Sequence, residues 1–277
     1  MIIKSLVKSL LRNLIDFGWK TRVGRYCADE ILRSAMRRTQ LLQHRGVNFT
    51  FAVPNNLNRY RINTFSSKEP ETLEWIDQIP SGAVVWDIGA NVGLYTCYAA
   101  KARGCQVFAF EPSVFNLELL ARNVFLNALA EKVTIVPLPL SDQLSANTLN
   151  MTSLEWGGAL SSFAQDYGQD GQALRKIFEF RTIGISISDA VERLKIPPPD
   201  YLKMDVDGIE HLILKGGAEV LRNVKGVLVE INDEFTKQRV DSAQYLRDAG
   251  LHLREKRHAE MFESGTFKNC FNQIWQR

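Results

Sequence analysis

Two acidic residues, each at the end of an apolar segment, are the clearest candidates for chemistry in this sequence. Asp87 follows one apolar segment and leads into a turn that contains Gly89 and Gly93, and Glu111 directly follows a second segment, 106–110. Glycine lets backbone approach a ligand closely, and a carboxylate at the tip of the next strand can accept hydrogen bonds from both ribose hydroxyls. This spacing therefore predicts a site for an adenosyl group.

The spacing of the glycines also argues against one large class of ligand. A dinucleotide-binding turn uses G-x-G-x-x-G to hold a pyrophosphate, whereas the turn from Gly89 to Gly93 reads G-x-x-x-G. The pattern therefore favours a nucleoside cofactor without phosphates, and S-adenosylmethionine fits best. An NAD-linked oxidoreductase is the less favoured alternative.

The residues around the two acids have more than one interpretation each. Asp87 is expected to bind the ammonium group of the cofactor or to order the turn. Asn91 is expected to cap the following helix or to offer its backbone N–H to the methionyl carboxylate. Asp205 ends a further strand, where it could hold the ammonium, orient the acceptor or serve as general base. His211 is an alternative base, although packing is the more ordinary role for it.

A metal site is a further alternative at the same edge of the sheet. Asp205, Glu230 and Asn232 lie at the ends of adjacent expected strands, and oxygen ligands of this kind suit Mg²⁺. No spacing in the sequence establishes such a site, so no metal is predicted. Lys203 and Glu210 could instead have a structural role, as an ion pair at the strand–helix junction.

Apolar strands that alternate with helices must position these residues. Short apolar runs bounded by turn residues predict strands, and runs with helical periodicity predict helices between them. Continuous apolar strands indicate a mostly parallel sheet with helices on both faces, and thus an α/β fold. Residues 143–180 break the pattern with a long polar loop rich in Gly and Ser, in which Trp156 could stack on a sugar. Strands are expected at 83–88, 106–110, 133–137, 201–205, 227–232, 251–256 and 268–275, and helices at 92–102, 113–127, 185–194, 209–222 and 239–249.

The N-terminal part of the chain has a different character. Residues 1–45 show helical periodicity and carry ten Lys and Arg against three acids, although the whole chain has a net charge of only +3. Ile3, Leu6, Leu10 and Leu14 share one helical face. This face is expected to pack on the body of the protein or on a second subunit, and contact with an anionic membrane surface is the alternative. No aromatic stacking platform or known module accompanies the basic residues, so no nucleic acid is expected.

The composition is that of an ordinary globular protein. The chain has 277 residues, of which 45% are hydrophobic and 23% are charged, and it has no apolar run of the length of a membrane span. The four cysteines are scattered, which predicts buried free thiols and no disulfide or metal site. The sequence has no convincing signal peptide, so a cytoplasmic protein is expected, with peripheral attachment to the inner membrane face as the alternative.

Five motifs in a fixed order resemble the FkbM family of S-adenosylmethionine-dependent methyltransferases. They are 86–95 (WDIGANVGLY), 110–113 (FEPS), 140–142 (LSD), 203–210 (KMDVDGIE) and 229–232 (VEIN). The resemblance implies the class I methyltransferase fold, a Rossmann-like seven-stranded sheet with a terminal antiparallel strand. It also places Ser141 and Asp142 near the adenine and includes Ala90, Tyr95 and Pro112 in the cofactor-binding set. One departure is Asp207, where the family usually has Glu.

These observations together predict a methyltransferase with an N-terminal extension at 1–57 and a catalytic domain at 58–277. The family is associated with O-methylation of sugars and natural products, so the expected acceptor is a hydroxyl of a sugar or another polyhydroxylated metabolite. Asp205 is the expected catalytic residue. A non-catalytic scaffold that keeps the fold is the main alternative function.

Overall fold

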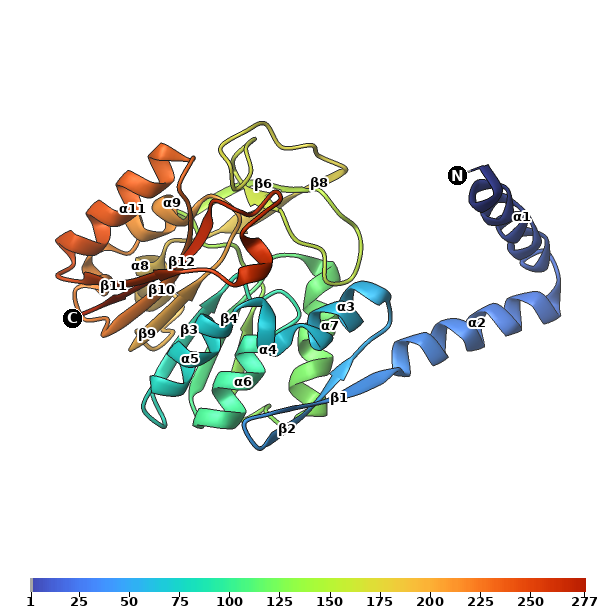
Figure 1. Ribbon diagram of the computed structural model, residues 1–277, viewed down its shortest axis with the longest axis horizontal. Coiled ribbons are helices and arrows are strands. Elements are labelled where there is room, and N and C mark those ends of the chain that lie inside the picture. The colour runs from blue at the N-terminus through green and yellow to red at the C-terminus, as the bar shows by residue number, and fades with distance from the viewer. Residues whose placement is uncertain (1) are drawn as a thin grey trace.

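A seven-stranded sheet forms the centre of the computed structural model, which describes residues 2–277 and the side chains of residues 9, 10 and 12–277. The strand order is β11-β12-β10-β9-β3-β4-β5 (Figure 1). Neighbours run parallel from β10 to β5, whereas β12 is antiparallel to both β10 and β11. The expected fold is therefore confirmed. The strands are β3 (Val84–Ile88), β4 (Gln106–Phe110), β5 (Val133–Val136), β9 (Tyr201–Met204), β10 (Gly226–Asn232), β11 (His252–Arg257) and β12 (Cys270–Gln276).

Helices cover both faces of this sheet, which explains why its inner strands are apolar throughout. Trp86 of β3 belongs to one hydrophobic core, and its neighbour Val85 belongs to the other, because successive side chains of a strand point to opposite faces. The core around Val85 also includes residues of α5 (Pro70–Gln78), α6 (Leu94–Arg103) and α7 (Val114–Leu126). The core around Trp86 includes residues of α8 (Ile187–Glu192), α9 (Glu210–Lys215), α10 (Ala218–Leu221) and α11 (Thr236–Asp248).

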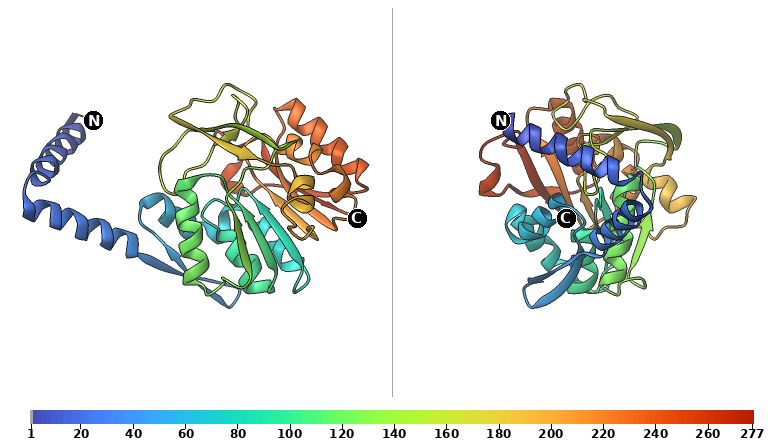
Figure 2. Two further views of the ribbon diagram at one scale, coloured as in Figure 1. Left: turned by 180° about the vertical axis from the view of Figure 1, so that it is seen from behind. Right: turned by 90° about the vertical axis from the view of Figure 1, so that its right-hand side faces the viewer.

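Two helices lie outside this body at the N-terminus. Helices α1 (Ile2–Gly18) and α2 (Arg22–Arg37) extend away from the α/β domain (Figures 1 and 2). The expectation that the amphipathic helix packs on the body is therefore wrong for this structure. The helical periodicity also ends earlier than expected, because β1 (Thr39–His44) pairs with β2 (Val47–Ala52) as a hairpin.

The hairpin is attached to the body through side-chain amides of α7. The backbone N–H of Thr50 donates to Asn127 Oδ1 at 3.0 Å, and the backbone N–H of Ala52 donates to Asn123 Oδ1 at 2.8 Å. Asn123 and Asn127 are both buried, so these bonds are shielded from water. The expected boundary between an extension and a domain at residue 57 stays a prediction.

The segment expected as one long polar loop contains a second, smaller sheet. Strand β6 (Ser145–Met151) lies between β7 (Ser162–Phe163) and β8 (Phe178–Gly184), and all of its pairings are antiparallel. Leu149, Met151 and Phe163 attach this sheet to the core around Trp86. The remaining part of the segment, around residues 153–161, crosses the carboxyl edge of the main sheet.

Two smaller expectations also need correction. The helix expected at 209–222 is divided into α9 and α10 at Gly216, where an added Cβ would lie 2.6 Å from the carbonyl oxygen of Ser141. All four cysteines are free, and three are buried as expected, whereas Cys27 on α2 is exposed.

Candidate active site

The candidate site is a cavity of about 370 Å³ at the carboxyl edge of the main sheet. This volume lies in the usual range of small-molecule sites, and the carboxyl edge is where open α/β sheets bind ligands. The ends of β3, β4, β9 and β10 form its floor. Helix α3 (Asn56–Asn63), helix α4 (Phe65–Lys68), the loop 158–161 and the 3-10 turn η1 (Glu260–Phe262) close it from above.

The two glycines of the predicted turn are required by the protein's own packing. Gly89 has φ +81°, and an added Cβ would lie 1.9 Å from the carbonyl oxygen of Asp205 on the neighbouring strand. Gly93 has φ +79°, and its Cβ would lie 2.3 Å from Leu120 Cδ1. A Cβ at Gly89 would thus overlap backbone, and a Cβ at Gly93 would require the buried Leu120 side chain to move and would adopt an unfavourable φ, before any ligand is considered. Close approach of a ligand to Gly89, which lines the cavity, stays a prediction.

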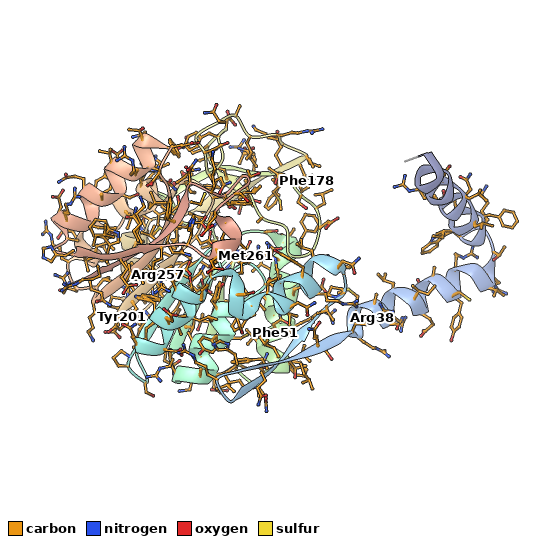
Figure 3. All side chains as sticks on the ribbon, in the orientation of Figure 1. Arg38, Phe51, Phe178, Tyr201, Arg257 and Met261 are labelled. Atoms are coloured by element: carbon orange, nitrogen blue, oxygen red, sulfur yellow. The ribbon has the colours of Figure 1, made fainter. Side chains whose placement is uncertain are left out.

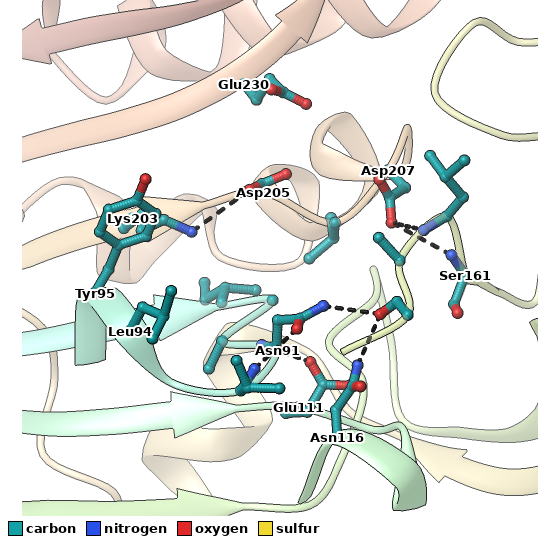
Figure 4. Close-up of a pocket in the computed structure, with 18 of the residues that line it drawn as sticks. Asn91, Leu94, Tyr95, Glu111, Asn116, Ser161, Lys203, Asp205, Asp207 and Glu230 are labelled. Carbon is teal, nitrogen blue, oxygen red and sulfur yellow. Dashed lines mark hydrogen bonds and ion pairs between the residues drawn. The ribbon is translucent and has the colours of Figure 1, made fainter. Parts of the chain in front are cut away.

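Glu111 is a buried carboxylate that faces the cavity and is held from two sides. Its Oε2 accepts the backbone N–H of Asn91 at 2.8 Å (Figure 4), and its Oε1 accepts the backbone N–H of Ser113 at 2.8 Å. Burial raises the pKa of Glu111 to about 7, although these two hydrogen bonds act in the opposite direction. Each carboxylate oxygen can accept more than one bond, so Glu111 keeps acceptor capacity on its cavity side.

Asn91 connects the glycine turn with the loop that covers the cavity. It has φ +50°, its Oδ1 accepts the backbone N–H of Val92, and its Nδ2 donates to the carbonyl of Gly158 at 2.8 Å. Asn116 Nδ2 donates to the same carbonyl at 3.0 Å, and its Oδ1 accepts the N–H of Gly157. The two amides thus fix the covering loop directly over Glu111.

A buried charge cluster lies beside the glycine turn. Lys203 Nζ is 3.4 Å from Asp87 Oδ1 and 3.7 Å from Asp205 Oδ2, and it lies 5.4 Å from the centre of the Tyr95 ring. Burial alone would lower the pKa of Lys203, but Asp87 and Asp205 outweigh it and raise the pKa. Asp87 also accepts a hydrogen bond from Thr96 Oγ1 at 2.5 Å. Asp87 therefore orders Lys203 and α6, while Lys203 and Asp205 line the cavity.

Further carboxylates line the cavity beyond Asp205. Glu230 extends from β10, next to β9, and burial together with the charges of Asp205 and Glu69 raises its pKa well above the usual range. The backbone of Glu230 pairs with Asn272 on β12, but no hydrogen bond or ion pair joins its side chain to another of the residues that the structure describes. Lys68 forms an ion pair with Glu69 at the opposite wall. This end of the cavity is therefore rich in acids, with two lysines among them.

Asp207 has a clear structural task. Its Oδ2 accepts the backbone N–H of Leu160 at 2.7 Å and that of Ser161 at 3.3 Å (Figure 4). It has φ +63°, and burial followed by the charge of Asp205 raises its pKa to about 7. The shorter acid at this position thus holds the covering loop 158–161 from the side opposite to Asn91.

The structure brings most of the predicted site residues together. Asp205 lines the same cavity as the predicted residues of the glycine turn and of the segment after β4. Four others lie outside the lining: Asp87 lies beside Lys203, Gly93 ends the turn against Leu120, Ser141 is buried, and Asp142 forms an ion pair with Lys215 at 3.0 Å. The predicted residues that line the cavity are Gly89, Ala90, Asn91, Tyr95, Glu111, Pro112 and Asp205. The roles of all these residues toward a cofactor stay predictions.

Three of the alternative interpretations do not match the geometry. Lys203 and Glu210 do not pair, because Glu210 instead accepts the backbone N–H groups of Val206 and Gly208. His211 is buried and does not line the cavity. The indole of Trp156 lies outside the lining as well, although the loop that follows it forms part of the cover.

Some lining residues could not be identified from the sequence. Asn116 lies in the first turn of α7 and Asn272 lies in the last strand, where Asn272 Nδ2 donates to buried Glu71 at 2.8 Å. Their only local signal is an amide at a position that packing would otherwise fill with an apolar residue. Among residues 2–277, no group of three or more His, Cys, Asp or Glu has an arrangement that could hold a metal ion.

An open, mostly parallel sheet with a glycine turn after one strand and a buried acid after the next defines an α/β protein that binds a nucleoside-type ligand. Residues 87–258 match the family model described as the methyltransferase FkbM domain. This match covers more than half of the sequence, so the chain belongs to the FkbM methyltransferase family. The expected family and its cofactor, S-adenosylmethionine, are thereby confirmed, and an NAD-linked oxidoreductase is not supported.

The relatives are distant. The hexuronic acid methyltransferase AglP of Haloferax volcanii is 25% identical over 198 residues, which cover 72% of this chain and 76% of the relative. The 31-O-demethyl-FK506 methyltransferase FkbM of Streptomyces tacrolimicus is 24% identical over 180 residues, which cover 56% of this chain and 68% of the relative. Among solved structures, the Aeropyrum pernix fibrillarin complex with S-adenosyl-L-methionine aligns with a TM-score of 0.48 at 11% identity, over 87% of this chain and 84% of that chain.

The cavity has the groups that S-adenosylmethionine needs. Glu111 offers buried carboxylate oxygens of the kind that ribose hydroxyls require, and the cavity also has an apolar wall of the kind that an adenine ring requires. Lys203 and Asp205 offer opposite charges for the methionyl carboxylate and ammonium groups. The residues present therefore fit this cofactor. The apolar wall consists of Ile88, Phe110, Leu138, Leu140, Phe163 and Ile209.

Proposed function

We propose that this protein transfers the methyl group of S-adenosylmethionine to a hydroxyl of a sugar or a polyhydroxylated metabolite. The observation that carries the proposal is that one cavity joins Glu111, beside an apolar wall, to the acid-rich region around Asp205 and Glu230. The first region suits a nucleoside, and the second suits a partner with several hydroxyl groups. A methyl donor and a hydroxyl acceptor could thus lie end to end.

At the cofactor end, the proposed roles follow from position. Glu111 accepts the two ribose hydroxyls, and Gly89 and Ala90 form the backbone surface beneath the methionyl part. Backbone carbonyls near Asp205 bind the ammonium group, and Lys203 faces the carboxylate. Asp87 acts from behind by holding Lys203 at 3.4 Å, which is the second of its two expected roles, to order the turn.

The cofactor supplies an electrophilic methyl group on a sulfonium. The protein's task is to hold the acceptor oxygen in line with that methyl, at about 3 Å, so that a C–O bond forms while the S–C bond breaks. The hydroxyl proton must leave in the same reaction, and we assign its removal to the carboxylate of Asp205, which ends β9 at the cavity. Glu230, on the adjacent strand, is positioned to hydrogen-bond a second hydroxyl of the acceptor.

The charge of the cavity favours a neutral acceptor. Six carboxyl groups line it against three basic side chains, and the charges of Asp205 and Glu69 already raise the pKa of Glu230, so a further negative charge on the acceptor would be disfavoured beside these acids. Alternating acceptors and donors, such as Glu230 and the amide of Asn272, suit vicinal hydroxyls. The relatives' names support a sugar or a hydroxylated natural product, but the hexuronic acid named for one of them carries a charge that this cavity does not favour.

The test is a methyl-transfer assay with S-adenosylmethionine and a panel of neutral sugars, polyols and hexuronic acids. Asp205→Asn is expected to lower kcat by about 100-fold or more, because a positioned general base contributes about 10²–10⁴-fold. Asp241→Asn is the matched control, because this partly exposed acid on α11 lies outside the cavity and pairs with Lys237. Binding of S-adenosylhomocysteine is measured in parallel for each protein.

The outcomes separate the two candidate functions. Transfer to a hydroxyl that Asp205→Asn impairs, with the control unaffected, supports the proposal. Cofactor binding without transfer to any acceptor would favour the non-catalytic scaffold. Full activity of Asp205→Asn would remove Asp205 from the chemistry and leave it as a structural partner of Lys203.

A further inference from the structure

The two N-terminal helices form an arm that the methyltransferase reaction does not use. Helix α2 has no buried residue, and both helices extend away from the domain that contains the cavity (Figures 1 and 3). We define residues 2–38 as the arm. An isolated helix in water is only marginally stable, so a pair of helices without a covering partner calls for an explanation.

Defined contacts hold the corner of the arm, where α1 meets α2. The Thr21 side chain caps α2 by accepting the backbone N–H of Gly24 at 2.9 Å, and Thr21 Oγ1 donates to the carbonyl of Gly18 at 3.0 Å. A Cβ at Gly24 would lie 1.9 Å from the oxygen of Gly18, so the two helices meet through glycine. Close packing at Gly18 and Gly24 thus determines the bend, and it fixes the angle between α1 and α2.

Large apolar side chains on this arm are exposed to an unusual degree. Val23 on α2 is 73% exposed and Phe17 on α1 is 68% exposed. Val23, Cys27 and Ile31 follow one another at a spacing of four residues, so they form a stripe along one side of α2, with Tyr26 beside it. Leu10, Leu14 and Phe17 form the corresponding stripe on α1. The other large apolar residues exposed on the arm are Ile15, Trp19 and Leu32.

The charge of the arm is opposite to that of the rest of the chain. The arm contains nine Lys and Arg and three Asp and Glu, a net charge of +6, whereas the remaining residues have a net charge of −3. Arg25 lies on the side of α2 opposite the apolar stripe, and Arg22 and Arg33 lie on its flank beside Tyr26. Basic side chains opposite an apolar face with aromatic residues are typical of a helix that lies in a membrane interface.

We infer that the arm is a peripheral binding element for an anionic phospholipid surface. Its apolar stripes would enter the headgroup region while its basic side chains meet lipid phosphates. Trp19 and Tyr26 are of the type that favours the boundary between lipid and water. No helix among residues 2–277 has the length and apolar character to cross a bilayer, so the arm would lie on the surface. Each arm has a net charge of +6, so charge does not favour the pairing of two arms.

The test uses the full chain and vesicles of phosphatidylcholine, with or without about one third phosphatidylglycerol, in a flotation assay. Binding is expected only to the anionic vesicles and is expected to fall with added salt, since charge attraction is screened beyond about 10 Å at 0.1 M salt. Replacement of Arg22, Arg25 and Arg33 by Gln is expected to weaken partitioning by about 100-fold, at roughly fivefold per basic side chain. Arg181→Gln on β8 is the control.

A second variant tests the apolar contribution separately. Phe17→Ser, Trp19→Ser and Tyr26→Ser together are expected to abolish partitioning, whereas Phe125→Ser with Ile183→Ser, which removes exposed apolar side chains of the body, is expected to leave it unchanged. Binding of S-adenosylhomocysteine serves as the folding check for every variant, because the arm lies away from the cavity. Equal binding to neutral vesicles, or no binding to either kind, would overturn the inference. A dimer in solution that the arm variants dissociate would overturn it in favour of a second copy of the chain.

Discussion

Replacement of Glu111 by Gln tests the assignment of the cofactor end of the cavity. Gln keeps the size of the side chain, but it removes the charge that would accept the ribose hydroxyls. A hydrogen bond to a charged group contributes about 1.5–3 kcal/mol, so the Kd of S-adenosylhomocysteine at pH 8 is expected to rise about 10- to 150-fold. The variant is expected to fold, because burial already disfavours the charged form of Glu111, as its raised pKa shows.

The same substitution predicts a change in the pH dependence of binding. The pKa of Glu111 is raised to about 7 in the cofactor-free protein, so below pH 7 most of the molecules hold a proton there. If ribose binds to the carboxylate, that proton must leave, and the affinity of the wild type should fall as the pH falls. With a pKa of about 7, the contribution of Glu111 amounts to about tenfold between pH 8 and pH 6. Glu111→Gln removes this contribution.

Calorimetric titration with S-adenosylhomocysteine at pH 6, 7 and 8 provides the measurement. The ratio of the Kd of the variant to that of the wild type should be largest at pH 8 and should shrink by about tenfold at pH 6. Glu131→Gln, at an exposed acid, is the control for the loss of one charge. Equal affinity of Glu111→Gln and wild type at pH 8 would exclude Glu111 from the cofactor site. Equal pH slopes would refute the argument from its protonation.

Two further predictions concern the turn and the covering loop. Gly89→Ala is expected to lower the free energy of unfolding by at least about 2 kcal/mol, because its Cβ would overlap the oxygen of Asp205. Gly82 also has a positive φ, +79°, but no atom lies near the position of its Cβ, so Gly82→Ala measures the cost of the dihedral angle alone. Both variants are compared by chemical denaturation, and an equal loss of unfolding free energy in the two would contradict this account. Asp207→Ala is expected to increase amide hydrogen exchange at 160–161 about tenfold, since two hydrogen bonds to a carboxylate are lost. Asp166→Ala, which removes an exposed acid in the same segment, 143–180, should leave the hydrogen exchange at 160–161 unchanged.

Local sequence patterns were sufficient to predict the parts of the site that are built from consecutive residues. The apolar strands before Asp87, Glu111 and Asp205 are continuous in the sequence, and parallel strands bring their carboxyl ends to one edge. The positions of these three acids could therefore be predicted together. The cofactor followed from the same pattern, because the spacing of Gly89 and Gly93 does not suit a pyrophosphate.

Patterns were insufficient wherever distant segments meet. Strand β6 has polar residues on both sides, so its alternation was too weak to reveal a sheet within 143–180. Asn116 and Asn272 come from a helix and a terminal strand, and nothing near them in the sequence indicates the cavity that they line. The glycines were identified correctly, but the reason was incomplete, since the carbonyl of Asp205 approaches Gly89 from a strand more than a hundred residues later.

The sequence by itself determined the order of the strands and helices of the main sheet, the glycine turn, and the acids at the carboxyl ends of β3, β4 and β9, because each depends on residues close together in the chain. It also determined that the N-terminal helices have an apolar face. Only the tertiary structure decided what surrounds each of these features. It placed Asp87 behind the turn as a partner of Lys203, joined Asp207 to the covering loop, and left α1 and α2 without a partner on the body. Contacts between distant segments depend on how the whole chain packs, and no local pattern encodes them.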